Sequence, residues 1–147
     1  MSRIAVNTAL KYASGASWDP YAVCLEATRT GLRTEIDAWI RAPSPTNTAV
    51  IFLLSAGAGV GKTALAHTIA QRCATEKILL SSFFFHRDTA ERNTPDTLIS
   101  TIAIDMCKIH QTIQRRIEAA LEDDRSLASP PISRQFDRLL VDSSHIR

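Results

Sequence analysis

The chain has 147 residues, of which 45% are hydrophobic and 22% are charged, and these proportions are typical of a globular domain with a core. Its formal net charge of +2 is too small to predict an extended nucleic-acid surface. The cysteines, Cys24, Cys73 and Cys107, lie far apart without a C-x-x-C pair, which favours neither a disulfide framework nor a zinc site. No apolar run is long enough for a signal peptide or a membrane span, so the sequence predicts a soluble, cytoplasmic protein without a membrane partner.

The first third of the chain is predicted to hold a leader, one helix and a linker. Residues 1–21 mix Ser, Gly, Asn and Pro with isolated apolar residues, and we expect a flexible leader there. Residues 22–47 are expected to form an amphipathic helix followed by a linker. Apolar residues recur at helical spacing from Thr30 to Ile40, and the helix should end before Pro43 because proline disfavours helix at the preceding residue.

Residues 48–147 are predicted to contain a strand, a helix and a second strand in that order. The first apolar run, 49–54, is rich in β-branched residues and apolar on both faces, as a buried parallel strand would be. A glycine-rich turn and a helix ending near Cys73 follow it, and a second apolar run, 78–85, comes next. We therefore expect an α/β fold, a parallel sheet with flanking helices that is incomplete because the chain ends early.

The last third is predicted to be helical. Thr94, Pro95 and Asp96 supply an N-cap, a first-turn proline and an acidic residue for a helix start. Apolar residues then recur at helical spacing from Leu98 to Leu121. After a break at 123–131, Ser133 is expected to cap a last short helix.

The residues with the clearest chemistry lie between the first apolar run and the following helix. They read Ala56-Gly57-Ala58-Gly59-Val60-Gly61-Lys62-Thr63-Ala64. The three glycines can adopt positive φ at low cost, which lets successive N–H groups surround phosphate oxygens. Lys62 supplies a charge for the β- and γ-phosphates, and the Thr63 hydroxyl is placed to coordinate Mg²⁺. The sequence therefore predicts a Walker A loop that binds ATP or GTP with Mg²⁺, although Ala56 stands where the strict pattern has glycine.

The segment 52–66 resembles the nucleotide-binding segment of NACHT-type STAND NTPases, a group of P-loop NTPases, and especially the fungal nephrocystin-like proteins. Upstream, 24–30 resembles the Cys-Leu-x-Gly-Thr-Arg stretch of that family, and downstream 82–85 resembles its second strand. The resemblance implies the amino-terminal part of a signalling switch, in which bound nucleotide controls the assembly of protein partners through regions that this chain lacks. It also implies that Thr28 and Arg29 approach the base.

Hydrolysis in that family needs an acidic strand of four apolar residues ending in Asp. The nearest match is 139–142, but Leu139 and Leu140 continue a helical spacing from Phe136, which favours the tail of a helix. We expect the acidic strand to begin beyond Arg147, so no catalytic residue is assigned and enzymatic activity stays open.

Two other functions stay open. A small P-loop kinase would use the same loop, but it needs an arginine-bearing lid and an acceptor pocket, whereas 98–122 has the pattern of an ordinary amphipathic helix. A degenerate protein would keep the fold as an interaction module without binding nucleotide. No Asn-Lys-x-Asp guanine motif occurs, which favours ATP over GTP. His67 is expected to be a partly exposed surface residue rather than a ligand.

Overall fold

A computed structural model describes residues 5–25, 28–42 and 51–144 of the chain. The chain divides into two compact units. We call Asp19–Ile78 the loop unit, because it contains the predicted phosphate loop, and Met1–Trp18 together with Leu79–Arg147 the helical unit. Most of the predicted linker, 43–47, and the first two residues of the run at 49–54 lie outside the described residues.

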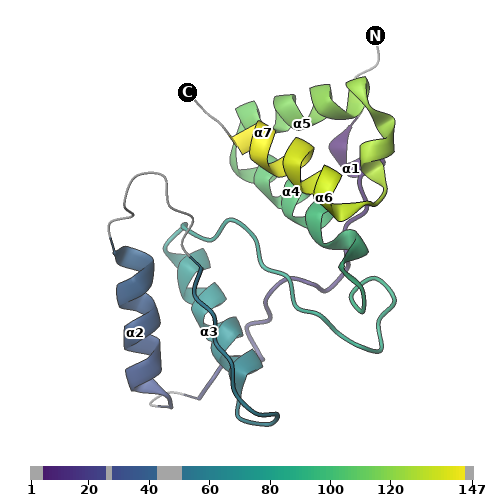
Figure 1. The fold of residues 1–147 in the computed structure, drawn as a ribbon. Coiled ribbons are helices and arrows are strands. Elements are labelled where there is room, and N and C mark those ends of the chain that lie inside the picture. The colour runs from purple at the N-terminus through teal and green to yellow at the C-terminus, as the bar shows by residue number, and fades with distance from the viewer. Residues whose placement is uncertain (1–4, 26–27, 43–50, 145–147) are drawn as a thin grey trace. The chain divides into compact units, whose positions relative to one another are not determined.

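The loop unit contains two helices, α2 (Thr30–Arg41) and α3 (Lys62–Thr75) (Figure 1). Both confirm helices that the sequence predicted, α2 from its apolar spacing and α3 from its place after the glycine-rich loop. Each buries a narrow apolar face. Ile36 is buried on α2, and Leu65 and Ala70 are buried on α3.

Polar contacts connect the two helices of the loop unit. Arg72 of α3 donates a hydrogen bond to Asp37 of α2 and forms an ion pair with it. Arg41 donates to Glu76 over 2.8 Å, and this hydrogen bond lowers the pKa of the Glu76 carboxyl. Charged side chains of the two segments thus hold α2 and the end of α3 together.

The helical unit is built from short helices (Figure 1), and their buried side chains form one apolar cluster. In chain order its elements are α1 (Val6–Ala9), the 3-10 helix η1 (Pro95–Thr97), α4 (Leu98–Ile109), α5 (Gln111–Asp123), the 3-10 helix η2 (Arg125–Ala128), α6 (Ile132–Gln135), the π-helix η3 (Phe136–Val141) and α7 (Asp142–Ser144). The buried cluster consists of Val6, Leu10, Ala103, Ile104, Met106, Ile113, Ile117, Leu121, Leu127 and Leu139. None of the helices in the described part of the chain combines the length and the apolar character that a bilayer crossing requires.

Part of the segment expected to be a leader lies in this core. Val6 and Leu10 are buried in the cluster, and the Ala13 N–H donates to Thr101 Oγ1 of α4 over 3.0 Å. Nothing in the pattern of residues 1–21 predicted this burial, because the apolar residues there are isolated and α1 has only 4 residues. The contacts that order the segment come from α4 and α5, which are far away in sequence.

The long helical pattern predicted from Leu98 to Leu121 is interrupted at His110. This residue has φ −140° and ψ 116°, which is extended rather than helical, and its Nδ1 accepts a hydrogen bond from the Thr112 N–H over 3.3 Å. A side-chain acceptor at this position caps the start of α5 and stabilises the break. Ile113, Ile117 and Leu121 are buried on α5, as their spacing predicted.

The predicted α/β fold with a parallel sheet is wrong: the part of the chain that the structure describes is helical and contains no strand. Residues 51–54 and most of 78–85 belong to different units. Ile51 is 85% exposed, Leu53 is 86% exposed and Phe85 is 57% exposed, whereas a central strand has both faces covered. The error arose because a short apolar run predicts burial, but it does not by itself supply the neighbouring strands that would bury it.

Residues 139–142 are helical, as their spacing from Phe136 predicted. Phe136–Val141 is a π-helix and Asp142 begins α7, so the segment is helical and not an acidic strand. The Asp142 carboxylate lies 3.7 Å from Arg138 Nη1, one turn earlier.

Candidate functional site

The predicted phosphate loop, Ala56 to Ala64, runs into the first turn of α3. The sequence predicted that a helix would follow the loop. Gly59 has φ 76° and Gly61 has φ 80°, which is the left-handed region that only glycine enters at low cost. The third predicted glycine, Gly57, is not among the residues with positive φ. Two of the three glycines therefore have the conformational role expected for them.

Lys62, the first residue of α3, folds back over the beginning of the loop. Its Nζ donates hydrogen bonds to the carbonyl oxygens of Ala56, over 2.6 Å, and Gly57, over 2.5 Å. These contacts close the loop by joining its first two residues to the start of α3. Ala56 accepts through its carbonyl oxygen, so the methyl group that it carries in place of glycine does not prevent this contact.

The first turn of α3 lacks a side-chain cap. Its N-cap residue is Gly61, and no side chain accepts a hydrogen bond there. The opening N–H groups of a helix have no acceptor within the helix, and they carry the positive end of its dipole. The turn has no acidic residue, and Thr63 is exposed. Uncapped amides, the Lys62 ammonium and the Thr63 hydroxyl thus meet at one end of a 14-residue helix.

A second basic side chain lies against the loop, and the sequence motif did not include it. Arg29 is the N-cap residue of α2, and its φ of 52° places it in the left-handed region. A Cβ atom built on Gly61 would lie 3.6 Å from Arg29 Nε and 3.7 Å from Nη2. The guanidinium group therefore lies directly beside the residue that precedes Lys62.

Behind the loop, α3 is anchored to residues 19–24 by two buried polar side chains. His67 Nδ1 accepts from the Asp19 N–H over 2.9 Å, and burial lowers the pKa of His67 although the charge of Asp19 opposes this. Thr68 Oγ1 accepts from the Cys24 N–H over 2.8 Å and donates to the Ala64 carbonyl. The prediction that His67 is partly exposed is wrong, because its ring is buried as a hydrogen-bond acceptor.

A metal site of protein ligands is not formed in the described residues, where no group of three or more His, Cys, Asp or Glu side chains is arranged to hold an ion. Thr63 is the single residue that the sequence assigned to Mg²⁺. Its hydroxyl is available for that role because the side chain is exposed.

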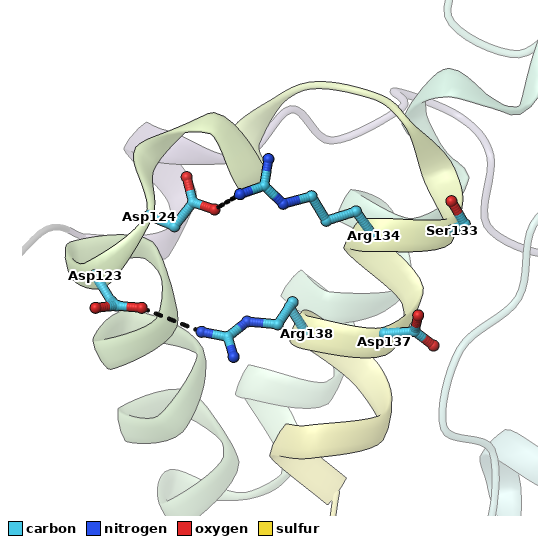
Figure 2. A pocket seen from close by; sticks show the side chains of 6 residues that line it. All are labelled: Asp123, Asp124, Ser133, Arg134, Asp137 and Arg138. Atoms are coloured by element: carbon cyan, nitrogen blue, oxygen red, sulfur yellow. Dashed lines mark hydrogen bonds and ion pairs between the residues drawn. The ribbon is translucent and has the colours of Figure 1, made fainter.

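The helical unit has a surface pocket of about 510 Å³ that the sequence did not indicate. Its lining residues are Asp123, Asp124, Ser133, Arg134, Asp137 and Arg138 (Figure 2). Arg134 pairs with Asp124, and Arg138 pairs with Asp123 over 3.2 Å. The arginines in this pocket are thus neutralised by carboxylates of the same pocket, which makes it a poor match for an anion.

The model of a protein family described as Nephrocystin 3, N-terminal, matches residues 32–146 of this chain. The match includes the predicted phosphate loop, α3 and all but the first two residues of α2, and it begins three residues after Arg29. No curated protein and no solved structure matches the chain.

Proposed function

This chain belongs to the family described as Nephrocystin 3, N-terminal, and from that premise we propose that it binds a nucleoside triphosphate through residues 56–64. The observation that carries the proposal is the closed loop at the start of α3. In that loop Lys62 Nζ lies 2.6 Å from the Ala56 oxygen and 2.5 Å from the Gly57 oxygen, and Gly59 and Gly61 have left-handed backbones. The proposal rests on this loop and helix and needs no sheet.

Each part of the loop has a role in the proposed complex. The uncapped N–H groups of Lys62, Thr63 and Ala64 donate to phosphate oxygens, with the helix dipole adding to the attraction. The Lys62 ammonium exchanges carbonyl oxygens for the β- and γ-phosphates, which are stronger, charged acceptors. The Thr63 hydroxyl would hold a Mg²⁺ ion, which would neutralise part of the phosphate charge.

We place this binding within a STAND switch of the NACHT type, where nucleotide state controls assembly with protein partners. The resemblance of 52–66 to that group supports the assignment. ATP is favoured over GTP because no Asn-Lys-x-Asp motif occurs. We propose nucleotide binding without hydrolysis, because Asp142, the nearest candidate for a hydrolytic acid, lies in a helix and pairs with Arg138.

Titration of fluorescent ATP and GTP analogues in the presence of Mg²⁺ tests the proposal directly. We expect the Lys62→Ala variant to bind about tenfold more weakly or worse, because it loses a charge-assisted contact worth roughly 1.5–3 kcal/mol. A matched control is Lys77→Asn, which removes the same charge at the other end of α3 and suits the left-handed backbone of Lys77, φ 59°. This control should bind as the wild type does.

Two outcomes would contradict the proposal. Equal affinity of the wild type and Lys62→Ala would remove Lys62 from the site. Failure of the wild type to bind either analogue would favour an interaction module that keeps the fold without the ligand.

A further inference from the structure

We propose that Arg29 is a second phosphate-binding cation of the loop, one that contacts the phosphate chain of the bound nucleotide rather than its base. This inference rests on the proposed function, because it concerns the same ligand. It goes beyond that function in assigning a specificity-determining residue outside the loop motif and outside the residues that the family model matches.

The position of the side chain carries the first step. The atoms of the Arg29 guanidinium group nearest to Gly61 lie 3.6–3.9 Å from where its Cβ would be. Gly61 is the N-cap residue of α3, so the group lies at the helix end where the uncapped amides converge. A ligand that reaches those amides with its phosphates comes within reach of the guanidinium group as well.

The charge of Arg29 carries the second step. In the described part of the chain no carboxylate pairs with its guanidinium group and no acceptor binds it, whereas Arg41 and Arg72 of the same unit pair with Glu76 and Asp37. A guanidinium group presents a planar fork of donors that matches two phosphate oxygens at once. An unpaired fork beside an ammonium group and free amides is complementary to a polyanion and offers little to a neutral base.

The backbone carries the third step. A non-glycine residue with φ near 52° is uncommon and costs energy, and such residues persist where the surroundings determine them. At Arg29 this conformation starts α2 and directs the side chain to the loop. Contact with a bound phosphate would therefore connect the ligand to the first turn of α2.

Competition against a fluorescent ATP analogue with Mg²⁺ separates phosphate contact from base contact. The competitors are ATP, inorganic tripolyphosphate, which has no base, and adenosine, which has no phosphate. We expect Arg29→Gln to weaken ATP and tripolyphosphate by about the same factor, roughly tenfold, and to leave adenosine unchanged. Arg29→Lys, which keeps the charge but loses the fork, should recover part of the affinity.

Arg33→Gln is the matched control, because it removes the same charge one turn further along α2, and it should bind every competitor as the wild type does. Circular dichroism and the melting temperature show whether Arg29→Gln is folded. Weakening of ATP without weakening of tripolyphosphate would assign Arg29 to the base and overturn the inference. So would unchanged binding of both.

The result for Lys62→Ala distinguishes this failure from failure of the proposed function. If Lys62→Ala loses affinity while Arg29→Gln does not, the loop binds nucleotide and Arg29 alone is wrongly assigned. If the wild type binds neither ATP nor tripolyphosphate, both proposals are overturned together.

Discussion

In the helical unit, ten buried residues form one apolar cluster, whereas in the described part of the loop unit the buried apolar residues are Ile36, Leu65 and Ala70. Polar contacts add to these in the loop unit: the Asp37–Arg72 and Arg41–Glu76 pairs, and the acceptors His67 and Thr68. Buried apolar area is the larger source of stability, since a hydrogen bond contributes only about 1 kcal/mol net. The proposed ligand site therefore lies in the less strongly held unit.

This difference has a consequence for the ligand. Binding sites that change conformation tend to lie in regions of low local stability, and a ligand that binds only the folded state stabilises it by mass action. A nucleotide bound between α3 and Arg29 would add contacts where the apolar core is smallest. The helical unit needs no such addition, because its core spans segments from both ends of the chain.

The largest expected effect comes from the core of the helical unit. Ile117 is fully buried on α5, so Ile117→Ala should leave a cavity and lower the free energy of unfolding by about 2–5 kcal/mol. Urea denaturation measures this loss. Glu122→Gln, an exposed change on the same helix, should stay within about 0.5 kcal/mol of the wild type. A loss as small for Ile117→Ala as for the control would mean that this cluster does not stabilise the unit.

A smaller effect is expected from the ion pair of the loop unit. A double-mutant cycle with Asp37→Asn and Arg72→Gln should give a coupling free energy of about 0.5–1 kcal/mol that declines in 1 M salt. The Arg41–Glu76 pair should couple less, because its side chains are 53% and 37% exposed against 37% and 19% for Arg72 and Asp37. Equal coupling of the two pairs would show that exposure does not rank these contacts.

The sequence was sufficient where local spacing decides structure. The apolar period of Leu32, Ile36 and Ile40 predicted α2, and the spacing of Ile113 and Ile117 predicted the buried face of α5. The sequence was insufficient where the structure of a segment depends on residues far away in the chain. Burial of Val6 depends on α4 and α5, and the strands expected at 49–54 and 78–85 depended on neighbours that residue spacing cannot supply.

The candidate site shows the same division. Gly59, Gly61 and Lys62 are close in sequence, so their pattern predicted a compact loop before α3. Arg29 lies more than thirty residues upstream of Gly61, and residue spacing cannot show that its side chain contacts the loop. His67 was misjudged for the same reason: its ring accepts a hydrogen bond from Asp19, which is also distant in sequence, and no helical period reveals that contact.

The smallest expected effect is a pH dependence at His67. Burial lowers the pKa of His67, and only the neutral ring can accept the Asp19 N–H at Nδ1. The contribution of the ring to stability should therefore be complete above pH of about 6.5, the ordinary value, and be lost as the pH falls below it. We expect a loss of about 0.5–1 kcal/mol, the worth of one hydrogen bond, in the free energy of unfolding between pH 7.5 and 5.5. His67→Gln should lack this component and the exposed His86→Gln should keep it, so identical pH dependence in wild type and His67→Gln would contradict the assignment.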